Sequence, residues 1–216
     1  MKRISASALA CAAGFLGLSG PASAHPHVFA EARLEVEVAP DGHVSALRHV
    51  WRFDELFSST VLLEFDADLD NQLEEPELAE VASVVTGSLA EFDYFQTILV
   101  GGKSVGVKPV TDMKALFEDG QLIMFFTAEP DETIDIAASP SFGVYDPTFY
   151  TAIDFYDESN MELRGAPANC SFKMVVPDPD EAIAQNQASL TEAFFNEPTG
   201  NDLSSLLATR MEVTCK

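Results

Sequence analysis

Basic residues are scarce in this sequence of 216 residues. It contains 12 Lys and Arg residues against 35 Asp and Glu residues, which gives a formal net charge of −23 at pH 7. Nucleic acids and anionic lipid surfaces are bound through clusters of Lys and Arg, so we expect neither among the partners. A chain this acidic attracts cations, although an acidic surface that is merely solvated would have the same composition.

Apolar runs long enough to cross a bilayer are also lacking. The apolar stretch over residues 6–18 is too short for a membrane span, and it follows two basic residues, Lys2 and Arg3. Residues 22–24, Ala-Ser-Ala, have the small-x-small pattern of a signal peptidase site. We therefore interpret residues 1–24 as a cleaved secretory signal rather than a retained anchor, which predicts a periplasmic protein with no direct membrane anchor.

Cysteine is rare as well, with three in the whole chain. Cys11 leaves with the signal, so the mature chain, a single domain over residues 25–216, keeps an even pair in an oxidising compartment. Cys170 and Cys215 each lie in a short strand-like run, and we predict a disulfide that ties the C-terminal strand to its neighbour. A metal site built on thiolates is the alternative, but neither cysteine has another Cys or His beside it.

What the sequence does contain is a regular alternation of apolar and polar residues. A hairpin is expected over residues 32–53, with a Pro-Asp-Gly turn at 40–42 and with His49 in an apolar row beside Trp51 and Phe53. The chain is 47% apolar, which is enough for a real core. Further strands are expected at residues 97–100, 104–109, 114–118, 122–128, 133–138, 142–145, 150–156, 170–176 and 210–215.

Helical spacing of apolar residues follows the hairpin. A first helix is expected over residues 54–65, with Asp54 as its N-cap, and a second from about Pro76 to Phe95. The residues expected on the buried face of the first helix are Leu56, Val61, Leu62 and Phe65. Later helices are expected over residues 178–195 and near 202–208. The predicted class is α+β: mostly antiparallel sheet with a helix-loop-helix (EF-hand-like) insert over residues 54–95 and a C-terminal helix.

The acidic segment DADLDNQLEEPE, residues 66–77, has the spacing of an EF-hand calcium loop. Calcium is a hard cation that takes six to eight oxygen ligands, and helical patterns flank the segment on both sides as the motif requires. The predicted ligands are the side chains of Asp66, Asp68, Asp70 and Glu77, the backbone carbonyl of Gln72, and Glu74 acting through a water molecule.

Two positions depart from the ideal calcium loop. The sixth position, normally glycine, is Asn71, which tolerates left-handed backbone better than most residues. The fourth position, usually polar, is Leu69. A single loop outside the cell is expected to bind calcium weakly, with a Kd on the order of 10⁻⁴ to 10⁻³ M, and to serve structure. The alternative is an acidic helix–turn–helix that holds no ion.

Histidines supply the second candidate site. After cleavage His25 carries both the terminal amine and an imidazole, and His27 follows, but Pro26 has no N–H to lose and blocks the planar amino-terminal copper/nickel chelate. Imidazoles suit Zn²⁺, Ni²⁺, Co²⁺ or Cu²⁺, and His49 and Asp146 are the candidates for further ligands. The alternatives are a buried, hydrogen-bonded core histidine at His49 and an ordinary Asp-Pro turn at Asp146.

Enzyme motifs are missing. The sequence has no His-Glu-x-x-His and no Gly-x-Ser-x-Gly, and GGKS at residues 101–104 lacks the upstream glycine of a P-loop. Neither remaining cysteine has the surroundings of a nucleophile, and the carboxylates are too numerous to single out an acid and a base. We therefore expect a protein that is not an enzyme.

Several blocks of the sequence resemble a bacterial periplasmic family known as domain of unknown function 1007, described as the periplasmic component of an uncharacterised ABC-type transport system. The blocks, in this order, are AHPHVFAEARLE, LRHVWRFDELFS, DADLDNQLEEPEL, SLAEFDYF, VYDPTFY and GAPANC. The resemblance implies a link to transition-metal uptake and an inner-membrane metal permease as partner. Its motif positions are His25, His27, His49 and Asp146, the same candidate ligands.

Three functional hypotheses result. The leading one is a periplasmic accessory protein that binds Zn²⁺, Ni²⁺ or Co²⁺ for an uptake system and carries a structural calcium loop. The second is a calcium-stiffened interaction or regulatory module of a permease, with no transition-metal site. The third, a metal-dependent redox or hydrolytic activity at the N-terminal histidines, has no evident base or nucleophile to support it.

Overall fold

The computed structural model describes residues 26–178, 181–182, 184 and 207–216. The predicted signal over residues 1–24 and the candidate ligand His25 lie outside these residues. So does most of the predicted helix over 178–195 and most of the short helix near 202–208, and the predicted C-terminal helix therefore stays a prediction.

The larger sheet is built around the expected hairpin. Strands β1 (Val28–Val38) and β2 (Val44–Phe53) pair in antiparallel fashion. Strand β6 (Gln121–Ala128) pairs with β2, and β5 (Lys114–Glu118) pairs with β6 at the edge. The Pro-Asp-Gly turn is confirmed, because Gly42 adopts the left-handed φ of 88° that a tight turn favours at glycine. The four strands β1, β2, β5 and β6 therefore agree with the predicted ones.

The other edge of this sheet is parallel. Strand β8 (Thr151–Asp154) pairs with the first part of β1, and β9 (Met161–Arg164) pairs with a later part. A short 3₁₀ helix, η3 (Glu158–Asn160), lies between them. The fold is therefore α+β with mostly antiparallel sheet, as predicted, and with a parallel edge made of two short strands.

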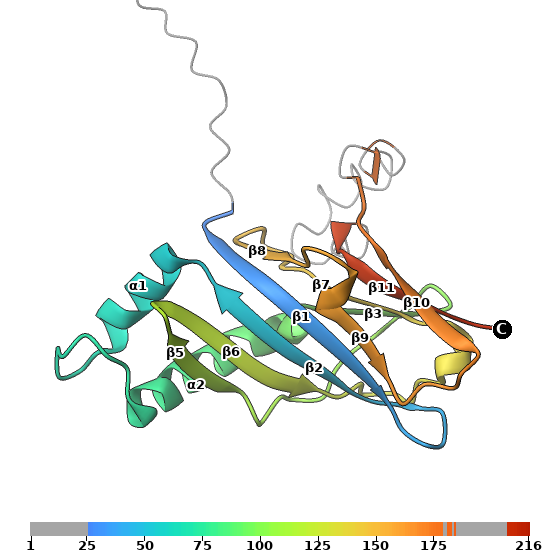
Figure 1. The fold of residues 1–216 in the computed structure, drawn as a ribbon, viewed down its shortest axis with the longest axis horizontal. Helices are drawn as coiled ribbons and strands as arrows, with labels where there is room; N and C mark the ends of the chain where they lie inside the picture. Colours follow the sequence, from blue (N-terminus) through green and yellow to red (C-terminus); the bar gives the residue numbers. More distant parts are fainter. Residues whose placement is uncertain (1–25, 179–180, 183, 185–206) are drawn as a thin grey trace, which may run out of the picture.

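The smaller sheet lies behind β1 and β2 (Figure 1). It is antiparallel, in the order β10-β11-β7-β3-β4. Its strands are β3 (Gln96–Val100), β4 (Lys103–Val105), β7 (Ser141–Val144), β10 (Cys170–Val175) and β11 (Arg210–Cys215). Cys170 and Cys215 are directly opposite each other on β10 and β11 and form a disulfide, which confirms the predicted pair.

One predicted strand was wrong. Residues 133–138 were expected as a strand, but Ile136–Ala138 form a 3₁₀ helix, η2, in which the Asp135 carboxylate accepts a hydrogen bond from the Ala137 amide. Ile134 and Ile136 are buried, and the chain beside them pairs with residues 42–44 through a single isolated bridge, between Asp135 and His43. An Asp that bonds the backbone two residues on favours a turn over a ladder.

The two helices are those expected, with a shorter second one. Helix α1 spans Glu55–Phe65 and is capped by Asp54, whose carboxylate accepts from the Phe57 amide. Helix α2 spans Glu75–Leu89, in contact with β5, and runs behind the larger sheet in Figure 1. None of the described helices is long and apolar enough to cross a membrane.

The second helix was predicted to continue to Phe95, which is wrong. The chain leaves α2 through a 3₁₀ segment, η1 (Ala90–Phe95), where Asp93, Tyr94 and Phe95 all have positive φ. This backbone is unfavourable for residues with a side chain, and it turns Tyr94 and Phe95 into the core, where both are buried. Burial of two aromatic rings offsets the local strain.

Three of the four residues predicted on the buried face of α1 are confirmed, since Val61 is buried and Leu62 and Phe65 pack against the core, but Leu56 is wrong. Ser58 and Val61 are its buried residues, whereas Leu56 is 75% exposed. The Ser58 hydroxyl donates to the Asp54 carbonyl at 2.7 Å and accepts from the Leu122 amide of β6 at 2.9 Å. This hydrogen-bonded serine ties α1 to the sheet and leaves a row of apolar residues on the outer side of the helix.

Candidate functional site

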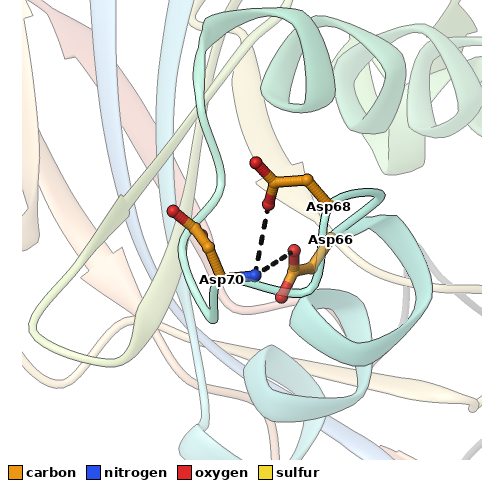
Figure 2. A group of neighbouring side chains, drawn as sticks. All are labelled: Asp66, Asp68 and Asp70. Atoms are coloured by element: carbon orange, nitrogen blue, oxygen red, sulfur yellow. Dashed lines mark hydrogen bonds between the residues drawn. The ribbon is translucent and has the colours of Figure 1, made fainter.

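The acidic segment 66–77 connects α1 to α2. Asp66 is the C-cap of α1: its amide donates the last helical hydrogen bond, to the Leu62 carbonyl, and its extended backbone ends the helix. Helix α2 begins at Glu75, inside the segment, with Glu74 as its N-cap. The segment is thus held between two helix ends, and its carboxylates project from one short stretch of chain (Figure 2).

Three aspartates lie close together in this segment. Each of Asp66, Asp68 and Asp70 offers a carboxylate oxygen, and these oxygens lie within 4.8 Å of one another. The Asp70 amide donates to Asp66 Oδ1 at 3.1 Å and to Asp68 Oδ1 at 3.2 Å, as Figure 2 shows. Asp66 is buried, whereas the other two are exposed. Local hydrogen bonds therefore hold two of the carboxylates toward the same amide.

Glu77 reaches back over the same segment. Its Oε1 accepts from the Ala67 amide at 2.8 Å and its Oε2 from the Glu74 amide at 3.0 Å. Asp68, Glu74 and Glu77 form a second group whose oxygens lie within 4.8 Å of one another. The amides of Glu74 and then Ala67 lower the pKa of Glu77, while the hydrogen bond to Glu77 raises the pKa of Glu74.

The backbone of the segment is left-handed at two of its residues. Leu69 has φ of 64° and Asn71 has φ of 65°. Asn71 suits this conformation, and its amide donates to Asp66 Oδ2 at 2.8 Å. Leu69 does not suit it and is 79% exposed. The Gln72 side chain donates to Asp70 Oδ2 at 3.1 Å, which orients that carboxylate.

His27 lies at the exposed start of the described chain. Its amide donates to the Tyr150 carbonyl at 2.8 Å, and its ring centroid lies 5.1 Å from that of Tyr150. The backbone hydrogen bond and the ring contact hold the residues just before β1 against the loop that precedes β8. His27 is therefore placed by the 146–151 loop.

His49 lies in the core between the sheets. Its ring stacks on Phe126 at 4.6 Å and meets Trp51 edge-on at 6.1 Å. Burial lowers the pKa of His49 to about 3, and the neighbouring Gln96 side chain acts weakly in the opposite direction. Among the described residues, neither ring nitrogen of His49 has a hydrogen-bond partner, and Gln96 Oε1 has none either. The two side chains are adjacent without a formed bond, and the imidazole is neutral at neutral pH.

Asp146 is buried, and both of its carboxylate oxygens accept hydrogen bonds. Its Oδ1 accepts from the amide and hydroxyl of Thr148, at 2.8 and 2.6 Å, and its Oδ2 accepts from the Thr151 amide at 2.8 Å. Burial, and then the charge of Asp146, raises the pKa of Tyr145 to about 12. These bonds order the loop into β8, which is the role of an Asp in a turn.

The structure keeps two of the predicted transition-metal ligands, His27 and His49, apart. His49 is opposite Leu34 in the sheet, and His27 precedes Leu34 by seven residues on the same extended chain. That separation is about 23 Å at the usual rise of a strand. Across the described residues, only the acidic segment brings three or more potential metal ligands within 4.8 Å. Strand alternation places His49 on the core-facing side of β2 but does not determine its distance from His27.

The fold and the acidic segment define an α+β protein of two sheets with a helix–loop–helix between β2 and β3. The chain belongs to the family described as "Protein of unknown function (DUF1007)", whose family model matches residues 10–215. It is also 22% identical, over 199 residues, to an uncharacterised protein of Haemophilus influenzae, a similarity that covers 89% of this chain and 92% of that protein.

Proposed function

We propose that this protein is an exported module that binds one calcium ion in the EF-hand-like loop of residues 66–77 and works beside an inner-membrane metal permease. The observation that carries the proposal is the approach of the Asp66, Asp68 and Asp70 oxygens to within 4.8 Å of one another. Calcium takes six to eight oxygen ligands in a flexible geometry, and an EF-hand loop supplies them from a single segment of twelve residues. Asn71, in the left-handed conformation, provides the turn at the position where the motif normally has glycine.

The predicted ligand set is compatible with the geometry of the loop. Glu77, at the last position of the loop, reaches back to the amide of Ala67 near its start. In the EF-hand motif the acid at this position supplies two oxygens to the ion. The Gln72 carbonyl and a water on Glu74 are the remaining proposed ligands. The role proposed for the ion is to stiffen the connection between α1 and α2, because a bound cation offsets the repulsion among carboxylates that lie this close.

The test is a calcium titration followed by thermal unfolding. Calcium is expected to raise the Tm of the wild-type protein, and Glu77→Gln is expected to abolish the rise. Glutamine keeps one acceptor for the helix cap, so the variant is expected to fold. Glu80→Gln, at an exposed position of α2 beyond the loop, is the matched control and should retain the rise. A wild-type Tm that does not respond to calcium would contradict the proposal.

Export is part of the same proposal. The Cys170–Cys215 disulfide supports an oxidising compartment, since such bonds are rare in reducing ones. Cleavage after Ala24 would place the protein in the periplasm, where a permease partner is accessible. Mass spectrometry of the protein recovered from cells tests this: an N-terminus at His25 is expected, and an intact residue 1–24 segment in the recovered protein would contradict it.

A transition-metal site is the second candidate. The observation in its favour is an exposed imidazole, His27, at the start of the described chain. A site for Zn²⁺, Ni²⁺, Co²⁺ or Cu²⁺ would use His25 and His27, and it would exclude His49 and Asp146 for the reasons given above. Isothermal titration with Zn²⁺ and Ni²⁺ is expected to lose affinity in His27→Ala and to be unchanged in His43→Ala, at the turn between β1 and β2. Equal affinity in wild type and His27→Ala would remove this candidate.

A further inference from the structure

The outer side of α1 is uncharged and apolar. Leu56 and Leu63 are 75% and 80% exposed, and they lie seven residues apart on one side of the helix with Thr60 between them. The hydroxyls of Ser59 and Thr60 donate to the Leu56 carbonyl, at 2.8 and 3.1 Å. Their polar atoms are therefore turned back onto the helix. We call the surface formed by these four residues the α1 stripe.

A stripe of this kind is unexpected on a solvent-facing helix. The opposite side of α1 already carries the residues that face the protein, Ser58 and Val61. A surface helix normally has polar side chains away from the core, and a helix that is apolar on both sides is normally covered on both. In Figure 1, α1 lies at one end of the molecule.

The negative charge around the α1 stripe indicates which kind of partner can bind there. Glu55 and Glu64 flank the stripe, and the chain from residue 53 to 102 contains twelve Asp and Glu residues and no Lys or Arg. A second copy of this chain would bring the same glutamates against these, and an anionic lipid surface would be repelled. A segment with aliphatic side chains flanked by Lys or Arg satisfies both the apolar row and the carboxylates.

A groove next to the stripe has the same character. It has a volume of about 310 Å³ and includes Glu55, the residue before Leu56, in its wall. Two exposed rings, Phe29 and Tyr156, line it. Its charged lining residues are four acids and one base: Glu31, Asp54, Glu55, Asp154 and Arg52. Aromatic faces beside carboxylates bind ammonium and guanidinium groups. The groove thus extends the acidic and apolar surface from the N-terminus of α1 to the edge of the larger sheet.

We propose that the α1 stripe, with the adjoining groove, is a docking surface for a basic amphipathic segment of another protein. The proposal rests on the proposed function in one respect, the assignment of an interaction role. It does not require calcium, because the stripe and the groove are formed by α1 and the sheet and include no residue of the 66–77 loop.

The test is binding of synthetic peptides to the purified protein, followed by fluorescence anisotropy. The probe is a labelled amphipathic peptide of leucine and lysine. One control peptide replaces each lysine by glutamate, and a second keeps the composition but scatters the leucines. The first peptide is expected to bind, with affinity that falls as salt is raised, and neither control should bind. Each titration is run with and without calcium, so that a failure of the docking surface and a failure of the calcium site are read separately.

Two variants locate the binding on the α1 stripe. Leu56→Gln and Leu63→Gln should each weaken binding about tenfold, since each removes the burial of one leucine. Leu116→Gln, at an exposed leucine of β5, is the matched control and should leave affinity unchanged. The proposal is overturned if the acidic peptide binds equally well or if both stripe variants bind as the wild type does. It is also overturned if Leu63→Gln abolishes self-association or vesicle binding instead of peptide binding.

Discussion

His49 makes the folded protein sensitive to acid, and the size of the effect follows from its burial. The pKa of His49 is lowered from 6.5 to about 3 in the folded state because the ring is desolvated. Between these two values the unfolded chain binds a proton that the folded protein does not, so stability falls as pH decreases from 6.5 toward 3. The loss relative to pH 8 is about 2 kcal/mol at pH 5 and approaches about 5 kcal/mol below pH 3.

The perturbation that isolates this contribution is His49→Phe. A phenyl ring retains the stack on Phe126 and removes two buried nitrogens that have no hydrogen-bond partner among the described residues. The variant is therefore expected to be at least as stable as the wild type at pH 7. Between pH 7 and pH 5 its free energy of unfolding should fall by about 2 kcal/mol less than that of the wild type.

The assay is urea unfolding at a series of pH values, followed by the fluorescence of the single tryptophan. Trp51 is buried beside His49, so its emission reports the loss of this part of the core. The difference between the wild-type and His49→Phe curves cancels the contribution of the carboxylates that titrate in both proteins. Parallel pH dependences between pH 7 and pH 5 would refute the reasoning. His49→Leu is a second variant in case the larger ring disturbs the packing.

Two further predictions concern stability at neutral pH. The double variant Cys170→Ser/Cys215→Ser should lower the free energy of unfolding by about 4 kcal/mol, which is the chain-entropy value for cysteines 45 residues apart. It should also make the stability insensitive to reductant. A loss below 1 kcal/mol in urea unfolding at pH 7 would contradict this. Ser58→Ala leaves the buried Leu122 amide without its acceptor and should cost about 1–3 kcal/mol, whereas Ser59→Ala, whose hydroxyl bonds only within α1, should change stability little in the same measurement.

Signals that act over a few residues predicted much of the fold. Asp54 caps α1, the Pro-Asp-Gly turn closes the hairpin, and alternation places His49 with Trp51 on the buried face of β2. The failures occurred where a tertiary contact changed the local preference. Tyr94 and Phe95 end the second helical segment early because burying their rings offsets left-handed backbone.

The two candidate sites differ in the same way. The acidic loop is contained in residues 66–77, so its spacing alone was enough to predict that Asp66, Asp68 and Asp70 lie together. The histidine site required residues from different parts of the chain. Strand alternation predicts which face His49 occupies, but only the register of β1 with β2 shows that it lies opposite Leu34, far along the strand from His27.

By itself, the sequence determined the class of the fold, the disulfide pair, the hairpin and the clustering of carboxylates between two helices. These depend on periodicity, caps, turns and spacing, which act along the chain over short distances. The tertiary structure alone decided that His27 and His49 are apart, that Asp146 accepts hydrogen bonds from Thr148 and Thr151, and that Leu56 faces outward. The physical reason is that strand register and the packing of α1 through Ser58 are set by contacts between residues far apart in sequence.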